Sequence, residues 1–341
     1  MEKRRVAING FGRIGRLSLR AFEASAKKYN FDIIAINDLQ DIDVSIHLLK
    51  YDSVHGRFDG NIQKISSSEF VLNGKRIIYI SENLPNKLPW KELNVDLVLE
   101  CTGAFKTKEL CNLHIEAGAR KVLVSHPLDD ADRTVIYGVN HDSLLNEEQI
   151  VSNASCTTNC LAHVINAIYK EVKILNGFAT TVHSYTGDQR LIDTNHKDLR
   201  RSRAAASSII PTSTGVTKAI EKIFPELLGK LSGFALRVPT PNVSLINFTF
   251  STTQKIVAND ICQMIIKYSS TVSEKIFTYT NDPLVSIDLN HSPSSAIVDL
   301  SLVKVVDGTL GHISAWYDNE WGFSNRMLDT AHHLMEITFR T

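Results

Sequence analysis

The chain has 341 residues, 43% hydrophobic and 22% charged, a balance that excludes disordered and fibrous proteins and is typical of a globular chain with two domains. Lys plus Arg and Asp plus Glu both number 37, so no net charge favours nucleic acid or an anionic membrane, and any anion has to be bound locally. We find no signal-peptide pattern and no run of about 18 apolar residues, so we expect a cytoplasmic protein.

Short apolar runs alternate with helical patterns over the first half of the chain. Strand, helix, strand is the rhythm of a parallel sheet whose strands are covered on both faces. We therefore predict an amino-terminal α/β domain with strands at 4–10, 31–38, 75–80, 95–103, 121–127 and 134–140.

A glycine-rich segment follows the first of these strands, where a helix should begin. Gly10-Phe11-Gly12-Arg13-Ile14-Gly15 is a G-x-G-x-x-G pattern, whose glycines permit a tight turn, close approach of a pyrophosphate, and close packing of helix on strand. The second strand ends at Asp38, where a carboxylate can accept from a ribose hydroxyl. This order predicts an NAD site. The alternative is that the glycines only build a turn and Asp38 caps the strand.

The candidate nucleophile is Cys156, within SNASCTTNC at 152–160. It lies at the start of an apolar helix for which Ser155 or Thr157 is a plausible N-cap. The helix dipole and free N–H groups there favour a thiolate over a thiol and can stabilise an oxyanion. An inert helix-start cysteine is the alternative. A metal or redox pair with Cys160 is disfavoured, because no second Cys/His pair at ligand spacing lies nearby.

His183 is the candidate base for this thiol. It comes at the end of the predicted strand 177–184, whose tip can present the ring across a cleft. The chain has twelve histidines, so a structural, hydrogen-bonded histidine is the alternative.

The pattern changes after residue 160. An apolar helix is followed by strand patterns at 177–184, 235–251 and 295–306, which predict a second domain with a mixed or antiparallel sheet. The last segment, 321–339, returns to helical spacing. Its apolar stripe consists of Met327, Leu328, Ala331, Leu334 and Met335.

Eight segments spread along the chain carry a family resemblance. They are NGFGRIGR (9–16), YDSVHGRF (51–58), YGVNHD (137–142), SNASCTTNC (152–160), TVHSYTGDQR (181–190), HKDLRRSRAAASSIIPTSTG (196–215), RVPTPNVS (237–244) and WYDNEWGFSNR (316–326). In this order they resemble phosphorylating glyceraldehyde-3-phosphate dehydrogenase of the bacterial type I form. The resemblance implies an α/β plus α+β fold. A Rossmann NAD-binding domain would cover 1–155 with 319–341, and a catalytic and tetramerisation domain 156–318.

The implied activity is oxidation of D-glyceraldehyde 3-phosphate to 1,3-bisphosphoglycerate, a reaction of glycolysis and gluconeogenesis. Cys156 would attack the aldehyde to give a hemithioacetal while His183 takes the proton and orients the carbonyl oxygen. Hydride would then leave for NAD, and inorganic phosphate would cleave the resulting thioester. The substrate's phosphate site would comprise Thr186, Asp188 and Arg237, and the inorganic phosphate site Ser155, Thr157, Arg200, Thr214 and Gly215. The alternative role for the two arginines is surface or interface ion pairing.

The same resemblance implies the cofactor contacts and the assembly. Arg13 and Ile14 would line the pyrophosphate, Asp38 the adenosine ribose, and Asn319 the nicotinamide carboxamide. The full cofactor set is Gly10, Phe11, Gly12, Arg13, Ile14, Asp38, Thr102, Ser125 and Asn319, without a metal. Segment 184–209 resembles an S-shaped loop at a tetramer interface, which implies a homotetramer with no dedicated nucleic-acid or membrane partner.

Several positions depart from the family's commonest pattern. Thr194 and Asn195 are small and polar where bulkier apolar residues are usual, a feature of forms that also accept NADP. Because the Asp38 carboxylate repels a 2′-phosphate, we expect NAD to be preferred with some use of NADP. Further departures are Asn83, His126, His163 and Phe323.

Three rival functions are compatible with parts of this pattern. Erythrose-4-phosphate dehydrogenase shares several segments, but the retained Thr186 and the run 212–215 favour the triose enzyme. A non-catalytic NAD-binding interaction protein would have no need to keep Cys156 and His183, and no basic patch supports RNA binding. A Cys/His hydrolase is disfavoured by the nicotinamide-binding elements.

Overall fold

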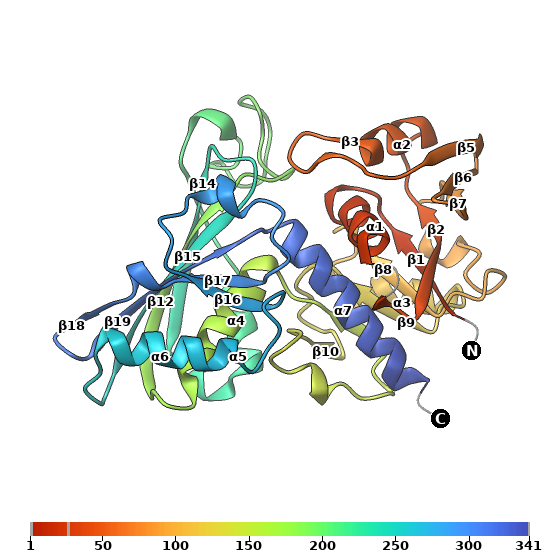
Figure 1. Cartoon of the computed structure of the whole chain (residues 1–341). Coiled ribbons are helices and arrows are strands. Elements are labelled where there is room, and N and C mark those ends of the chain that lie inside the picture. Colours follow the sequence, from red (N-terminus) through yellow and green to blue (C-terminus); the bar gives the residue numbers. More distant parts are fainter. Residues whose placement is uncertain (1–2, 26–27, 340–341) are drawn as a thin grey trace. The chain divides into compact units, whose positions relative to one another are not determined.

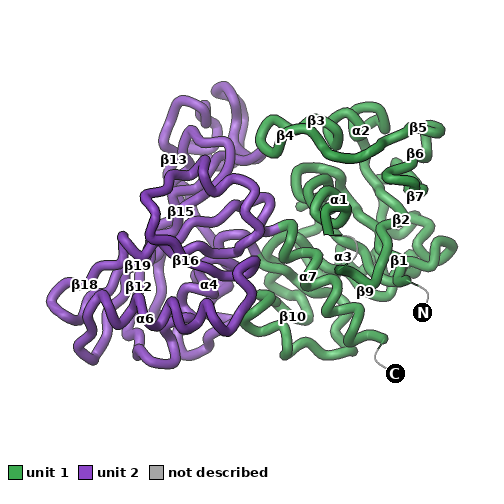
Figure 2. Tube along the Cα trace, in the orientation of Figure 1, with its two compact units in different colours: residues 1–154, 324–341 green, residues 155–323 purple. Residues whose placement is uncertain are grey.

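The computed structural model describes residues 3–25 and 28–339 and divides the chain into two compact units. Unit 1 consists of residues 1–154 and 324–341, and unit 2 of residues 155–323 (Figure 2). Over the described ranges, no helix has the length and apolar character needed to cross a membrane.

Unit 1 is built around β1 (Arg4–Asn9), which lies between β2 (Phe31–Asn37) and β8 (Leu97–Glu100) and runs parallel to both (Figure 1). The other elements are α1 (Arg13–Ser25), α2 (Ile42–Lys50), β3 (Tyr51–Asp52), β4 (Gly56–Arg57), β5 (Ile62–Ser66), β6 (Glu69–Leu72), β7 (Lys75–Ile80), η2 (Pro85–Lys87), α3 (Lys108–Glu116), β9 (Lys121–Val124), β10 (Arg133–Thr134), η3 (His141–Ser143) and β11 (Ile150–Ser152). The sheet order over the described part of the chain is β10-β11-β9-β8-β1-β2-β7-β6-β5. Over the described residues, β5, β6 and β7 are the strands of this sheet that pair antiparallel, and β3 and β4 form a separate antiparallel pair. The predicted parallel α/β domain is confirmed.

The strand predicted at 134–140 is wrong in extent. Strand β10 ends at Thr134, and the residues that follow form a turn. Gly138 adopts a left-handed φ of 89°, and the Asn140 side chain closes the turn by accepting from Ile136 N at 2.7 Å and donating to Thr134 O at 3.0 Å. Val135 and Ile136 are therefore buried, as the apolar run suggests, but they lie after the end of the strand and not within it.

Unit 2 contains a mixed sheet, as its sequence pattern predicts. The long central strand β12 (Ile174–Ser184) pairs in parallel with β14 (Leu231–Val238) and antiparallel with β15 (Ser244–Thr252). Figure 1 shows its helices grouped beside this sheet. The remaining elements are α4 (Cys156–Tyr169), η4 (Ala205–Ser207), β13 (Ile210–Thr212), α5 (Val216–Ile223), η5 (Pro225–Leu227), α6 (Ala258–Ser269), β16 (Phe277–Thr280), η6 (Ser286–Leu289), β17 (Ala296–Asp299), η7 (Leu300–Leu302), β18 (Lys304–Val306) and β19 (Leu310–Tyr317).

The last helix, α7 (Trp321–Thr338), groups with unit 1 from Ser324 onward. Its five predicted stripe residues are all buried. The polar contacts are specific as well, because the buried Asp329 accepts from Lys28 Nζ and from Tyr29 Oη, the latter at 3.2 Å. Burial of one apolar stripe and one carboxylate fixes which face of α7 is turned inward.

Candidate active site

The first turn of α4 is organised by its cap. Ser155 is the N-cap, with extended backbone, and its Oγ accepts from Thr158 N at 3.1 Å. The preceding Ala154 is fully buried at a left-handed φ of 56°, a strained conformation that turns the chain sharply into the helix. Cys156 is thereby the first helical residue, beside N–H groups that have no acceptor within the helix.

His183 lies next to this cysteine. Its Nε2 is 3.5 Å from Cys156 Sγ, and the ring is buried at the end of β12. His183 Nδ1 lies 2.7 Å from Ser184 O. In the tautomer that carries its proton on Nδ1 and donates it to this carbonyl, Nε2 can accept the proton of the thiol. The two residues therefore form a nucleophile and base pair within hydrogen-bonding distance.

Arg237 brings a positive charge to the same pair. The parallel register of β12 and β14 sets Arg237 beside His183, with Arg237 Nη1 2.6 Å from His183 Nδ1 and 3.0 Å from Ser184 O. Because a guanidinium can only donate, Arg237 donates to Ser184 O in the tautomer that carries a proton on Nδ1. Burial is the main cause that lowers the pKa of His183 to about 3, and the charge of Arg237 lowers it further in the same direction. Burial raises the pKa of the Cys156 thiol, although Arg237 and the Thr157 hydrogen bonds oppose this. The resting pair is thus a neutral thiol beside a neutral imidazole, and burial outweighs the thiolate-favouring helix start.

Tyr317, which the sequence analysis did not single out, contacts the residues around this pair. Its hydroxyl lies 3.0 Å from Thr157 Oγ1 and 2.7 Å from Thr181 Oγ1, and its ring meets His183 edge-on at a centroid distance of 5.9 Å. Tyr317 is buried, and so is Thr157, whose hydroxyl is directed at the tyrosine. Only its position at the end of β19, before the WGFSNR segment, could have indicated this role.

Two expected substrate-phosphate residues lie in a separate polar cluster. Thr186 donates from N to Gln189 Oε1 at 2.8 Å, and Gln189 Nε2 donates to Asp188 Oδ2 at 3.2 Å. Asp188 is also paired with Arg201, which donates from Nε to Thr212 Oγ1 at 2.7 Å. Sequence reasoning missed Gln189 and Arg201. Because Asp188 is itself an anion, its contribution to an anion site is to hold Arg201.

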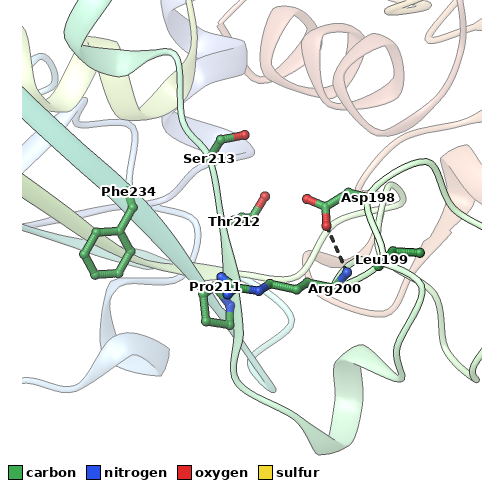
Figure 3. A pocket seen from close by; sticks show the side chains of 7 residues that line it. All are labelled: Asp198, Leu199, Arg200, Pro211, Thr212, Ser213 and Phe234. Atoms are coloured by element: carbon green, nitrogen blue, oxygen red, sulfur yellow. Dashed lines mark hydrogen bonds between the residues drawn. The ribbon is translucent and has the colours of Figure 1, made fainter.

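The expected inorganic-phosphate residues are divided between three places. Ser155 and Thr157 lie in the first turn of α4. Arg200 lines a cavity of about 620 Å³ together with Asp198, Leu199, Pro211, Thr212, Ser213 and Phe234 (Figure 3). Thr214 Oγ1 accepts from Val216 N at 3.3 Å, and Gly215 is the N-cap of α5. The structure gives no contact between Arg200 and Cys156.

Asn319 is held in one orientation. Its Oδ1 accepts from Ser184 Oγ at 2.9 Å and from Ser244 Oγ at 2.8 Å. With the oxygen bound by two hydroxyls, the Nδ2 group is left as a donor of fixed direction. Such a donor suits an amide carbonyl.

Unit 1 holds a second cavity, of about 390 Å³, at the carboxyl ends of β1, β2 and β8. Its lining residues are Asn9, Gly10, Gly12, Asn37, Asp38, Leu39, Gln40, Glu82, Asn83, Pro85, Cys101, Thr102, Ala104 and Phe105. Carboxyl ends of parallel strands are where open α/β sheets bind ligands. Asn83, one of the departures from the family pattern, thus lies in this lining.

The glycine-rich turn leaves room for a dinucleotide. A Cβ on Gly12 would meet no atom within 4 Å, whereas one on Gly15 would lie 2.1 Å from Gly10 O. Gly10 has φ +90° and would place a Cβ 2.6 Å from Thr102 N. Space at Gly12 and close packing at Gly10 and Gly15 fit a pyrophosphate beside the start of α1.

The polar groups around this turn are already oriented. Asp38 accepts from Phe11 N at 2.5 Å and from Gln40 N at 2.9 Å. The Arg13 guanidinium pairs with both oxygens of Asp52. Burial raises the pKa of Asp52, but hydrogen bonds from Arg13 and from backbone amides lower it to about 2.

The other assigned or unusual positions have partners of their own. Ser125 N donates to Glu100 O at 2.9 Å, and Ile14 lies in the first turn of α1. His126 Nε2 lies 3.0 Å from Phe105 O, and His163 Nδ1 lies 2.9 Å from Tyr268 Oη. In the part of the chain that the structure describes, the cysteines are free thiols, and no cluster of three or more His, Cys, Asp or Glu side chains could hold a metal ion.

Comparison with known proteins identifies related sequences over both units. Residues 4–108 match the family described as glyceraldehyde 3-phosphate dehydrogenase, NAD binding domain, and residues 155–319 match the corresponding C-terminal domain. The chain is 51% identical over 327 residues to glyceraldehyde-3-phosphate dehydrogenase of Xanthobacter flavus, covering 96% of this chain and 97% of the relative. It is 48% identical to the enzyme of Pseudomonas aeruginosa, with the same coverage, and 44% identical to that of Geobacillus stearothermophilus, covering 97% and 98%.

Proposed function

The chain belongs to the glyceraldehyde-3-phosphate dehydrogenase family, an NAD-dependent oxidoreductase family, and from this premise we propose how its residues perform the reaction. The protein oxidises D-glyceraldehyde 3-phosphate to 1,3-bisphosphoglycerate, with NAD as cofactor. The observation that carries the proposed mechanism is the 3.5 Å approach of Cys156 Sγ to His183 Nε2 at the start of α4.

The first step forms a carbon–sulfur bond. His183 Nε2 accepts the thiol proton as Cys156 attacks the aldehyde carbon, and the N–H groups at the start of α4 stabilise the oxygen that becomes negative. Protonation of that oxygen by His183 gives the hemithioacetal. Because the resting groups are both neutral, proton transfer accompanies attack instead of preceding it.

The second step oxidises this carbon. Bound NAD supplies the hydride acceptor. His183 takes the hydroxyl proton as hydride departs, and a thioester on Cys156 remains. An oxygen of inorganic phosphate then attacks the thioester carbonyl, and the Cys156 sulfur leaves to release the acyl phosphate.

Two anion sites would bind the two phosphate groups. Arg237 lies beside the reacting pair, and Asp188 holds Arg201 nearby, which supports placing the substrate phosphate with Thr186, Asp188 and Arg237. The N-terminal turns of α4 and α5 support binding of inorganic phosphate by Ser155, Thr157, Thr214 and Gly215, with Arg200 as the cation.

Unit 1 would bind the adenosine half of NAD in its 390 Å³ cavity. Gly12 leaves space for the pyrophosphate beside the backbone of Phe11, Arg13 and Ile14, and Asp38 can accept from a ribose hydroxyl. Thr102 and Ser125 would complete the cleft. Asn319 would donate to the carboxamide through its oriented Nδ2 group.

Assembly and location follow the same family reading. Four side chains of segment 184–209, Leu191, Ile192, Leu199 and Ile209, are 66–82% exposed, which supports a homotetramer interface there. A cytoplasmic location and the division into an NAD-binding domain at 1–155 with 319–341 and a catalytic domain at 156–318 stay predictions.

The decisive experiment measures NADH formation from glyceraldehyde 3-phosphate with and without inorganic phosphate. We expect phosphate-dependent turnover by the wild type and a loss of roughly 10⁴-fold or more in Cys156→Ser. Cys160→Ser is the matched control and should retain activity. Faster turnover of erythrose 4-phosphate would favour the erythrose enzyme, and turnover by Cys156→Ser equal to the wild type would contradict the mechanism.

A further inference from the structure

A chain of buried hydrogen bonds lies beneath the cofactor cavity of unit 1. Trp90 Nε1 donates to His114 Nδ1 at 3.0 Å, and His114 Nε2 lies 3.2 Å from Glu100 Oε2. All three residues are 0% exposed. None of them lines the cavity, and none belongs to the proposed mechanism.

The partners determine where the protons lie. An indole N–H can only donate, so His114 Nδ1 accepts, and the neutral ring must donate from Nε2 to Glu100. Glu100 also accepts from Asn9 Nδ2 at 2.5 Å, from Thr102 N at 2.8 Å and from Thr102 Oγ1. The two Glu100 oxygens thus receive four donors, which is what a buried carboxylate without a cation requires.

The network continues from Glu100 to residues that line the cavity. Asn9 Oδ1 accepts from Asn37 Nδ2 at 2.7 Å, and Asn37 is bonded to both backbone groups of Glu82. Asn9, Thr102, Asn37 and Glu82 all line the cavity. One carboxylate therefore ties together the ends of β1 and β8, and through Asn9 the end of β2.

We propose that His114 is a positioning residue for the cofactor, which acts through Glu100 to hold Asn9 and Thr102 in the shape that binds the adenosine half of the dinucleotide. The inference rests on the proposed placement of adenosine in this cavity. Without the Nε2 donor, one oxygen of Glu100 loses a partner that water cannot replace in a closed core. The carboxylate then turns, and the two wall residues that it orders turn with it.

Titration calorimetry with ADP-ribose and the full-length protein tests this. His114→Phe keeps a ring and removes both nitrogens, and we expect the Kd for ADP-ribose to rise about tenfold, equal to one lost buried hydrogen bond. His114→Gln keeps one donor and one acceptor and should restore most of the affinity. In turnover, His114→Phe should raise KM for NAD and leave kcat at saturating NAD near the wild-type value.

A purely structural role predicts a different result. Val122→Ala, a fully buried change on β9 outside the network, is the matched control for lost stability. If His114→Phe lowers the unfolding midpoint as Val122→Ala does and leaves the Kd unchanged, the inference is overturned. Should His114→Phe not fold, Trp90→Phe takes its place, and an unchanged Kd for ADP-ribose together with a lowered unfolding midpoint in that variant would overturn the inference. Failure of the wild type to bind ADP-ribose would instead overturn the proposed cofactor site, and the inference with it.

Discussion

At Cys156 opposing influences act on one sulfur atom. The helix start and Arg237 favour the thiolate, and burial favours the thiol. At His183 burial and Arg237 act in the same direction, and both favour the neutral ring. The chemistry of the pair therefore depends on local proton transfer over 3.5 Å and not on a standing ion pair.

The buried His183 makes stability depend on pH. Its pKa is about 3 in the folded protein and roughly 6.5 in an unfolded chain. Between these values the unfolded chain binds a proton that the folded protein excludes, so the free energy of unfolding falls as the pH is lowered from 6.5 toward 3. We expect the free energy of unfolding, measured with urea, to differ less between pH 4.5 and pH 7 in His183→Gln than in the wild type. Equal differences would show that His183 contributes nothing to this dependence.

We expect Asp38 to favour NAD over NADP. Its carboxylate, held by Phe11 N and Gln40 N, would repel a 2′-phosphate, whereas the small polar Thr194 and Asn195 resemble the residues of forms that also accept NADP. We expect kcat/KM to favour NAD in the wild type with measurable use of NADP. Asp38→Asn keeps the shape of the side chain and removes its charge. It should lower the ratio of kcat/KM for NAD to kcat/KM for NADP about tenfold. A wild type that prefers NADP would contradict this role.

At the scale of elements, helix starts organise both candidate sites. α1 begins at the glycine-rich turn and α4 begins at Cys156, and the first N–H groups of each helix have no acceptor within the helix, where we propose that an anion or an oxyanion is bound. β12 and β14 add His183 and Arg237 through their parallel register. The residues proposed to bind the cofactor and to react with the substrate thus lie at the ends of a few helices and strands.

Gly12 and Gly15 should respond differently to one methyl group. Because a Cβ on Gly12 meets nothing, Gly12→Ala should reduce the free energy of unfolding by less than about 1 kcal/mol, yet weaken NAD binding about tenfold or more. A Cβ on Gly15 would overlap Gly10 O, so Gly15→Ala should destabilise the protein by about 2 kcal/mol. Chemical denaturation and calorimetry measure both quantities. Unchanged NAD affinity in Gly12→Ala would contradict the proposed pyrophosphate position.

At the scale of the whole molecule, the exposed apolar residues of segment 184–209 point to an interface between subunits. Leu191 and Ile192 are adjacent in the chain and each 74% exposed, and neighbouring exposed apolar side chains are typical of a protein interface.

We expect native mass spectrometry to find a species of about four times 38.1 kDa. The double variant Leu191→Asp, Ile192→Asp should dissociate into smaller species, because charge is costly in a closed interface. Leu228→Asp, at a 71% exposed position outside the segment, is the matched control. A monomeric wild type, or a double variant that stays tetrameric, would contradict the assignment.

The amino-acid sequence by itself determined features that depend on close neighbours in the chain. The parallel sheet of unit 1, the glycine turn after β1 and the helix that begins at Cys156 all follow from periodicity and local backbone preference, which act over a few residues. The strand predicted at 134–140 failed where the Asn140 side chain closes a turn, a local bond that periodicity does not report.

Only the tertiary structure decided the features that need distant partners. Tyr317 contacts Thr157 and Trp90 donates to His114 because segments that are separated in the sequence are packed together in the fold. The protonation states of Cys156 and His183 belong to the same class. Burial outweighs the local helix start, and burial is a property of the folded molecule and not of any segment.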